Sequence, residues 1–362
     1  MWLRAGSLLV PKPTGLNSCQ NFCTPNMAAS PTRWGILGAG KIAVDFCTCL
    51  NSLPDHKIVA IAARSKDRAD QFAEEYDIPK SYGSYEEAIN DPDVDIIYIS
   101  TIHISHVELS LASINAGKSV LCEKPMALSL EGCKKVLAAA KEKNVFFAEG
   151  FWSRFFPVYQ FIREQVESGA LGEIHTVQVS FATPISNVER MRKRELGGGG
   201  LMDLGCYPVQ AANLVFKGRP ESIHVQGTLM EDTGVDSSAV ITLKYPGNKF
   251  AMLHYDMRTS AGANSFVIRG TKGNLVIPDK FWCPDRIVVG DNQLKYFQLP
   301  TVEEGRIIFV NSQGFCYEIQ DIRECLLKGQ IESSKIPHED SETISYILTE
   351  VQKQLGVSFE FP

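Results

Sequence analysis

The sequence has no apolar stretch close to the roughly 20 residues that a helix needs to span a bilayer. It also has no excess of positive charge, because 42 Asp and Glu residues outnumber 36 Lys and Arg residues and leave a net charge of -6. This balance provides no general attraction for nucleic acid or for an anionic membrane. We therefore expect neither a membrane nor a nucleic-acid partner, and any anion must be recognised by a local site.

The ten cysteines lack the spacing of a metal site or a redox pair. Cys47 and Cys49 are too close together for either, and Cys19 with Cys23 has no matching second cluster. Cysteines such as Cys122 lie in apolar patterns, where a reduced thiol behaves as a small buried hydrophobe. We expect no metal, a reducing compartment and hence a cytoplasmic location.

The first 26 residues lack acidic side chains but contain Arg4 and Lys12. A basic, acid-free segment could be a mitochondrial presequence, but it shows little amphipathic helical period. A disordered extension with Met27 as an alternative start is the favoured interpretation. We therefore treat residues 1–30 as a leader.

Between residues 31 and 150, short apolar runs alternate with helical patterns. The expected strands are Trp34–Leu37, Ile58–Ala63, Asp95–Ser100, Ser119–Cys122 and Val145–Ala148. Ser84 with Glu87, and Ser105 with Glu108, form capping boxes that begin helices. Such alternation predicts an α/β Rossmann domain with a doubly wound parallel sheet.

From residue 151 to residue 362 the pattern changes to alternation with a period of two. Val177, Val179 and Phe181 alternate with polar neighbours, and similar runs follow between turn signals. Helical patterns return near the C-terminus. This part predicts an α+β domain with an open, mostly antiparallel sheet.

The segment Gly38-Ala39-Gly40-Lys41-Ile42-Ala43 fits the G-x-G-x-x-G/A pattern between a strand and a helix. The first glycine permits the tight turn, and the second lets backbone amides approach a pyrophosphate. The start of the helix supplies further amides and a favourable dipole. The alternative is a packing turn, but the context favours dinucleotide binding.

The residues after the second strand, Ala62-Ala63-Arg64-Ser65, contain no carboxylate for the ribose hydroxyls of NAD. Arg64 could instead pair with a ribose 2′-phosphate, with Ser65 as a hydrogen-bond donor. This favours NADP. Asp67 keeps NAD open, and Arg64 could also be an ordinary exposed arginine.

Glu123-Lys124-Pro125 follows the apolar run Ser119–Cys122. A lysine just beyond the carboxyl end of a parallel strand lies where such sheets bind their ligands, near the nicotinamide. Its ammonium can stabilise developing negative charge and lower the pKa of an adjacent acid. A structural lysine paired with a carboxylate is the alternative.

A second candidate group follows four consecutive glycines at residues 197–200, which let the backbone pass close to a ligand or another segment. Asp203 and Tyr207 are four residues apart and share a face if the segment is helical. Tyrosine suits proton transfer to an alcohol when a cation depresses its pKa, and Lys124 is the candidate cation. Gly205 and Pro208 weaken the assumption of a continuous helix.

His103 and His106 follow the strand that ends at Ser100. The start of a helix disfavours imidazolium, so a neutral contact with cofactor or substrate is as reasonable as a structural role.

The segment around Trp152 and Phe155 lies where the chain leaves the first domain. Its aromatic residues are candidates for the substrate pocket or for interdomain packing, and Arg154 could reach the cleft. Trp282 is a further candidate for a pocket wall.

Together these segments resemble the Gfo/Idh/MocA oxidoreductase family from about Arg33 to the C-terminus. The residues that carry the resemblance are the Gly38 turn, Ala62 to Arg64, Tyr85 to Glu87, Thr101 to His106, Leu121 to Pro125, Trp152 to Pro157, Asp203 to Tyr207, Gly270 to Gly273 and Phe281 to Pro284. Many members have histidine at the Tyr207 position, and tyrosine there matches the dihydrodiol-oxidising branch of the family.

The resemblance implies NADP-linked oxidation of trans-dihydrodiols of aromatic hydrocarbons to catechols, and of D-xylose to its lactone. It implies that Lys124 is the catalytic lysine, with Tyr207 as acid/base and Asp203 beside them. It adds Thr101 and Glu123 to the cofactor contacts and implies a homodimer formed through the open sheet. Dehydrogenation of another sugar or polyol, reduction of an imine or tetrapyrrole, and a non-catalytic dinucleotide sensor remain alternatives.

Overall fold

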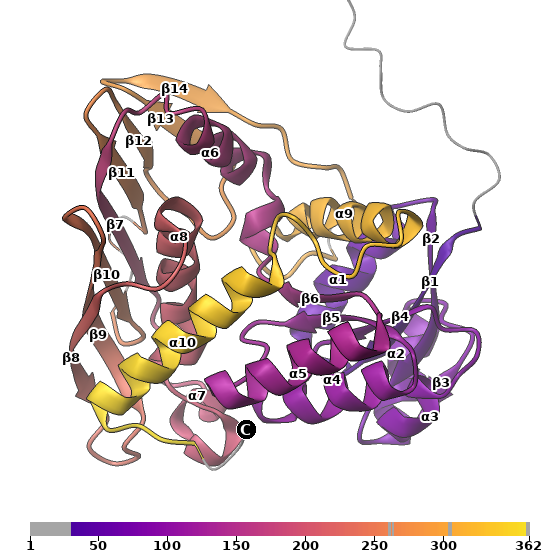
Figure 1. The fold of residues 1–362 in the computed structure, drawn as a ribbon. Coiled ribbons are helices and arrows are strands. Elements are labelled where there is room, and N and C mark those ends of the chain that lie inside the picture. The colour runs from indigo at the N-terminus through magenta and orange to yellow at the C-terminus, as the bar shows by residue number, and fades with distance from the viewer. Residues whose placement is uncertain (1–29, 260–261, 263, 303–305, 360–362) are drawn as a thin grey trace, which may run out of the picture.

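The computed structural model describes residues 30–259, 262, 264–302 and 306–359. The predicted leader, apart from its last residue, lies outside this range, as do Cys19 and Cys23. The chain forms two β-sheets with helices between and around them (Figure 1).

The first sheet has the strand order β3-β2-β1-β4-β5-β6, and every neighbouring pair is parallel. Its strands are β1 Thr32–Leu37, β2 His56–Ala62, β3 Ser81–Tyr82, β4 Ile96–Ile99, β5 Ser119–Glu123 and β6 Phe147–Gly150. Its helices are α1 Lys41–Asn51, α2 Lys66–Glu75, α3 Tyr85–Ile89, α4 His106–Asn115 and α5 Leu130–Lys143. The strand order reverses between β1 and β4, which places a ligand crevice at the carboxyl ends of these strands. The predicted Rossmann sheet is confirmed.

Of the two predicted capping boxes, the one at Ser84 forms its N-cap bond to the Glu87 amide. The Ser84 hydroxyl donates to Glu87 Oε2 at 2.9 Å and accepts from the Glu87 amide at 3.3 Å. The box at Ser105 was a wrong prediction, because a 3-10 turn over His103–Ser105 leads directly into α4. Ser105 is thereby already in a helical conformation, and its side chain caps nothing.

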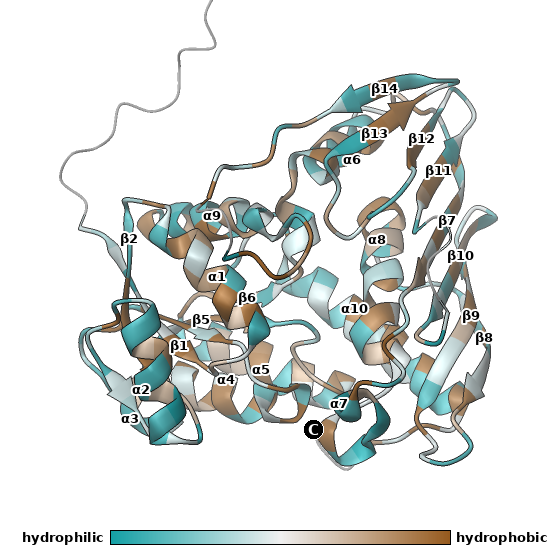
Figure 2. Ribbon diagram, turned by 180° about the vertical axis from the view of Figure 1, so that it is seen from behind, coloured by the Kyte–Doolittle hydropathy of each residue, from teal (hydrophilic) through white to brown (hydrophobic). Residues whose placement is uncertain are grey.

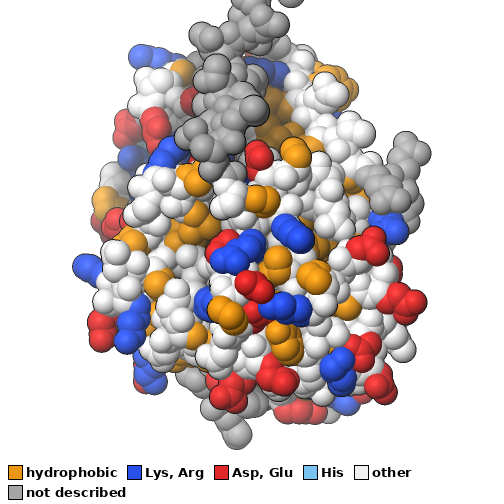
Figure 3. All heavy atoms as spheres, turned by 90° about the vertical axis from the view of Figure 1, so that its right-hand side faces the viewer, with side chains coloured by type: hydrophobic (Ala, Val, Ile, Leu, Met, Phe, Trp, Pro, Cys, Tyr) orange, Lys and Arg blue, Asp and Glu red, His pale blue; other side chains and the backbone are white. Residues whose placement is uncertain are grey.

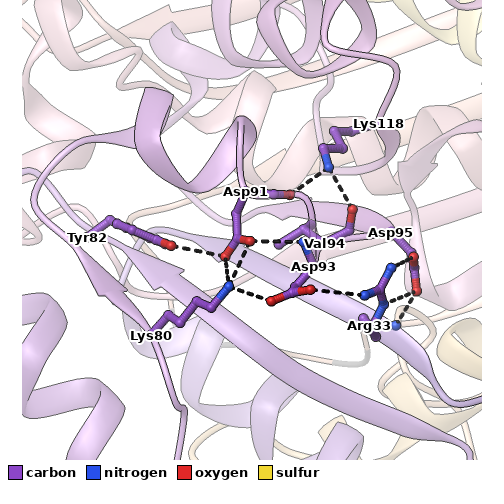
Figure 4. Close-up of polar contacts among 8 residues, drawn as sticks. All are labelled: Arg33, Lys80, Tyr82, Asp91, Asp93, Val94, Asp95 and Lys118. Carbon is purple, nitrogen blue, oxygen red and sulfur yellow. Dashed lines mark hydrogen bonds and ion pairs between the residues drawn. The ribbon is translucent and has the colours of Figure 1, made fainter.

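A charged network lies before the amino ends of the Rossmann strands (Figure 4). Buried Asp91 accepts hydrogen bonds from Lys80 at 2.9 and 3.0 Å and from the Tyr82 hydroxyl at 3.0 Å. Arg33 pairs with Asp95 at 2.7 Å. These ion pairs lie at the amino ends of the strands, while the opposite, carboxyl ends carry the candidate site.

The second sheet has the order β14-β13-β12-β11-β7-β10-β9-β8, in which only the β7–β10 pair is parallel. Its strands are β7 Ile174–Ala182, β8 Ser222–Leu229, β9 Asp236–Tyr245, β10 Lys249–Asp256, β11 Phe266–Gly270, β12 Asn274–Ile277, β13 Arg286–Val289 and β14 Gln293–Tyr296. Helices α6 Pro157–Glu167, α8 Cys206–Phe216 and α10 His338–Leu355 lie on one face (Figure 1). The predicted mostly antiparallel sheet is confirmed.

Helix α9, Phe315–Leu327, returns to the Rossmann domain late in the chain and packs on α1. The rings of Phe46 and Phe315 meet edge to face, with centroids 5.6 Å apart. Arg323 also donates to the Thr32 hydroxyl at 2.6 Å. The covering of the first sheet therefore includes residues from the C-terminal part.

Apolar side chains of both sheets and of the helices packed on them form the buried core. The outer helix α2 is largely hydrophilic (Figure 2). Figure 3 shows basic and acidic side chains interspersed on the face that lies to the right in Figure 1. Within the described residues, none of the helices is both long and apolar enough to cross a bilayer.

Glu318 on α9 generates a prediction about stability. Its carboxyl group is fully buried, and neither oxygen has a hydrogen-bond partner among the described residues. Burial raises the pKa of Glu318 well above its usual range, and the carboxylates of Glu123 and Asp321 raise it further. Because the folded pKa exceeds the unfolded one, the free energy of unfolding should fall as pH rises from about 4.3 towards the folded pKa.

Glu318→Gln should flatten this fall, by at most about 1.4 kcal/mol per pH unit for one proton. Urea unfolding at several pH values between about 5 and 8 measures the slope. Glu324→Gln, an exposed change on the same helix, is the control and should leave the slope unchanged. Equal slopes for Glu318→Gln and the unmodified protein would show that Glu318 does not titrate in this way.

Candidate dinucleotide and substrate cleft

A cleft of about 1000 Å³ lies where the carboxyl ends of β1, β2, β4 and β5 face the second domain. Most of the predicted cofactor residues line it: Gly38, Gly40, Lys41, Ile42, Arg64, Ser65, Thr101, His103, Glu123 and Lys124. The structure therefore brings together residues that are up to 86 positions apart, from Gly38 to Lys124. This is the crevice that the strand order predicts.

His106 is the exception among these residues. Its ring is completely buried and does not line the cleft. Nδ1 lies 2.8 Å from the Pro125 carbonyl oxygen, and Nε2 lies 3.1 Å from that of Thr101. The predicted cofactor contact is therefore wrong, and His106 instead ties together the two loops that follow β4 and β5.

The glycine turn suits a pyrophosphate. Gly38 has a φ of +106°, and a Cβ atom there would lie 3.0 Å from the Ser100 carbonyl oxygen. Gly40 precedes α1, and no side chain caps the amides of the first turn. These amides are free to bind an anion at the positive end of the helix dipole. The residues present fit a dinucleotide.

The end of β2 carries two arginines rather than one. Arg64 and Arg68 both line the cleft, and Arg68 donates to the Ala39 carbonyl oxygen at 3.1 Å. Ser65 caps α2, since its hydroxyl accepts from the Arg68 amide at 3.4 Å. Asp67 is not among the lining residues. The spacing of four between the arginines was the signal that would have identified Arg68 from the sequence.

Lys124 meets the second domain at Asp203. Its Nζ donates to the Asp203 carbonyl oxygen at 3.0 Å and lies 3.4 Å from Asp203 Oδ1. The same Nζ lies 4.9 Å from the centroid of the Tyr207 ring. Burial alone would lower the pKa of Lys124, but Asp203 and Tyr207 raise it, and the net shift is upward. Lys124 is therefore a cation in this site.

Asp203 is surrounded by three basic side chains. Besides Lys124, Arg190 NH2 lies 3.2 Å and His103 Nε2 3.9 Å from Asp203 Oδ1. Burial would raise the pKa of Asp203, but the charges of Lys124 and Arg190 hold it well below its usual range. Burial also lowers the pKa of His103, and the positive charge of Arg190 lowers it further, so this imidazole is neutral. Arg190 was missed because nothing near it in the sequence indicates a site.

Tyr207 lines the cleft at the start of α8, one turn beyond Asp203, which lies in a π-helical turn over Leu201–Gly205. Trp152 Nε1 donates to the Tyr207 hydroxyl oxygen at 2.9 Å. Burial raises the pKa of Tyr207, while Lys124 and the Trp152 hydrogen bond act in the opposite direction without reversing the shift. Lys124 thus lowers the pKa of Tyr207 as expected, but the net shift leaves the phenol protonated in this structure.

Aromatic side chains form the walls of the substrate end. The predicted Trp152 and Trp282 both line the cleft. Trp282 stacks on Phe181 with centroids 4.4 Å apart, and Trp152 stacks on Phe315 at 4.8 Å. Phe181 and Phe315 line the cleft too, although their sequence patterns indicated only packing.

Arg154 and Phe155 do not belong to this cleft, so both predictions are wrong. Arg154 is fully buried, pairs with Asp340 at 3.0 Å and donates to the Gln210 side chain at 2.6 Å. It therefore joins the start of the second domain to α8 and α10. Phe155 is buried in the core.

In the part of the chain that the structure describes, no three His, Cys, Asp or Glu side chains are grouped so that they could hold a metal ion.

Comparison with known proteins agrees with this geometry. A protein-family model described as "Oxidoreductase family, NAD-binding Rossmann fold" matches residues 32–151. A second family model, described as the GFO/IDH/MocA C-terminal domain, matches residues 159–276. Trans-1,2-dihydrobenzene-1,2-diol dehydrogenase of Xenopus laevis is 44% identical over 331 residues, 91% of this chain and 99% of that protein.

Among solved structures, a 3-ketoreductase from Actinomadura kijaniata in complex with NADP and TDP-benzene aligns with a TM-score of 0.76 and 25% identity. That alignment covers 90% of this chain and 98% of the other. Levoglucosan dehydrogenase in complex with NADH and levoglucosan aligns with a TM-score of 0.79 at 18% identity, over 90% and 98% of the two chains, and so shares the fold. The chain belongs to the Gfo/Idh/MocA oxidoreductase family. It is an oxidoreductase with an NAD(P)-binding Rossmann domain.

The conformation of the glycine turn predicts that adding a single methyl group at Gly38 weakens dinucleotide binding. Gly38→Ala should weaken dinucleotide binding by about tenfold or more, because alanine disfavours this φ by about 1 to 2 kcal/mol and its Cβ would crowd Ser100. Titration calorimetry with NADP measures the change. Gly117→Ala is the matched control, since Gly117 also has a positive φ of +75° but has open space around it, away from the cleft. Equal affinities of Gly38→Ala and the control would contradict the assigned role of the turn.

Proposed function

We propose that this protein is an NADP-dependent dehydrogenase that oxidises trans-dihydrodiols of aromatic hydrocarbons to catechols, and D-xylose to its lactone. The observation that carries the proposal is the placement of Lys124 and Tyr207 together at a strand end, between flat aromatic walls. The name of the Xenopus laevis relative supports the diol as substrate. Aromatic walls suit the planar hydrocarbon part of such a diol.

NADP is proposed over NAD because of the charge at the end of β2. Arg64 and Arg68 offer two guanidinium groups to a ribose 2′-phosphate, and no carboxylate lines this part of the cleft. The complex of the 3-ketoreductase with NADP is consistent with this choice, whereas levoglucosan dehydrogenase binds NADH.

The proposed mechanism assigns each polar group near Tyr207 a role. When bound, NADP supplies the hydride acceptor. In this oxidation the Tyr207 phenol first loses its own proton to solvent, and the Lys124 ammonium stabilises the resulting phenolate. Tyr207 Oη then takes the proton of the substrate hydroxyl. Trp152 holds the phenol oxygen in place by its 2.9 Å hydrogen bond. Asp203 orients the lysine through its carbonyl oxygen and Oδ1.

The uncovered face of the second sheet supports a homodimer. Exposed apolar side chains on this part of the sheet include Val240, Phe250 and Met252, which are 54%, 39% and 38% exposed. No described helix packs on this face, in contrast to the other (Figure 1). We propose that a second copy covers it, which a molar-mass measurement by light scattering tests: a monomeric mass would reject the dimer.

The proposed cytoplasmic location is supported by the state of the thiols. The eight described cysteines are all free and all buried. Such thiols persist in a reducing compartment. Cell fractionation tests the location, and recovery in an oxidising compartment would reject it.

Tyr207→Phe tests the proposed reaction. It should lower kcat by about 100-fold or more, because the proton acceptor is lost, while the dissociation constant of NADP changes little. Steady-state kinetics with a trans-dihydrodiol and calorimetry with NADP separate the two quantities. Tyr82→Phe is the control, since its hydroxyl also makes a hydrogen bond, to Asp91 at the opposite edge of the sheet. Near-normal turnover in Tyr207→Phe would eliminate this tyrosine as the acid/base.

A further inference from the structure

One wall of the cleft is a short apolar loop, residues 308–310. Ile308, Phe309 and Val310 are 49%, 42% and 45% exposed, an unusual run of three large apolar side chains. Phe309 and Val310 line the cleft. The loop belongs to the C-terminal part of the chain, just before α9, yet it lies over α1 of the Rossmann domain.

A single buried carboxylate holds this loop. Asp45, in the second turn of α1, is completely buried. Asp45 Oδ1 accepts from the Ile308 amide at 2.8 Å, and Oδ2 accepts from the Phe309 amide at 2.9 Å. The Ser312 hydroxyl also donates to Oδ2, at 2.5 Å.

These bonds determine where the side chains of the loop lie. Successive backbone amides that converge on one anion fix the local backbone, and hydrogen bonds to a charged acceptor are about twice as strong as neutral ones. Because the amides of Ile308 and Phe309 turn inward to Asp45, this backbone leaves the side chains of Phe309 and Val310 displayed at the cleft instead of burying them. The binding of an apolar ligand that covers this exposed apolar surface is favourable, because it removes the surface from water.

We propose that Asp45 is a positioning residue that holds Phe309 and Val310 as an apolar wall of the substrate cleft and thereby favours substrates with a hydrocarbon face. This inference rests on the proposed function and adds a determinant of substrate choice to it. A hydrocarbon ring gains from this wall, whereas a polyhydroxylated sugar would leave hydroxyl groups facing carbon atoms. Asp45 itself does not line the cleft and touches no reacting atom.

The anchor also links the two halves of the site. Asp45 lies on the helix whose first turn is expected to bind the pyrophosphate, only five residues after Gly40. The apolar wall is therefore fixed to the same helix as the cofactor turn, so cofactor and substrate wall keep one relative position.

The test compares two substrates in Asp45→Ala and in the more conservative Asp45→Asn. In Asp45→Ala, KM for trans-1,2-dihydrobenzene-1,2-diol should rise about tenfold, while KM for D-xylose and kcat for both substrates change by about twofold at most. In Asp45→Asn, which keeps one acceptor oxygen, KM for the diol should lie between the values for Asp45→Ala and the unmodified protein. Asp91→Asn is the matched control, because Asp91 is also buried and multiply hydrogen-bonded but lies at the far edge of the sheet.

An equal rise of KM for both substrates would overturn the inference, and so would an unchanged ratio of the two KM values. A general loss of stability would affect both substrates alike. A second readout needs no turnover: in Asp45→Ala and Asp45→Asn the amides of Ile308 and Phe309 should exchange hydrogen at least about tenfold faster than in Asp91→Asn. Unchanged exchange would also overturn it. If the unmodified protein does not oxidise the diol, the proposed function fails, and the exchange rates alone then decide whether Asp45 anchors the loop.

Discussion

The contact between Lys124 and Asp203 is the interaction on which the arrangement of the cleft depends. It joins the end of β5 in the Rossmann domain to the π-helical turn of the second domain, with side chains only 13% and 18% exposed. Removing two charges from water is costly, so such a pair is weak evidence for stability. Its value here is positional, because it fixes an ammonium group beside the ring of Tyr207 and at the mouth of the dinucleotide crevice.

The second domain delivers Asp203 to this contact through its glycine run. Gly199 has a φ of +125°, and a Cβ atom there would lie 2.4 Å from Asp236 Oδ1. Asp236 in turn accepts from the Leu201 amide at 2.6 Å and from the Tyr255 hydroxyl at 2.8 Å. The run of glycines thus lets the chain pass directly over the second sheet, and the next turn projects Asp203 and Tyr207 towards Lys124. The sequence-based interpretation of the glycines as a close approach of two segments is confirmed.

Local patterns were sufficient for the fold and for most of the residues that line the cleft at the strand ends, although they missed Arg68 and misplaced His106. The glycine turn, the strand ends and the cap at Ser84 each depend on residues that are near one another in the sequence, and the parallel sheet follows from their alternation. Groups that act across the domain boundary could not be placed in this way. Arg190 and Phe181 enter the cleft only because the second sheet packs where it does. Arg154 was misplaced for the same reason, since its partners on α8 and α10 are 56 and 186 residues away.

In the proposed function, the Lys124 ammonium beside Tyr207 makes this cleft the site of an NADP-linked diol dehydrogenase. The most direct test incubates the purified full-length protein with trans-1,2-dihydrobenzene-1,2-diol and follows the absorbance of reduced nicotinamide, with NADP and NAD in parallel. The account predicts turnover with NADP and a higher kcat/KM for NADP than for NAD. No reduction of either dinucleotide, or a preference for NAD, would contradict it.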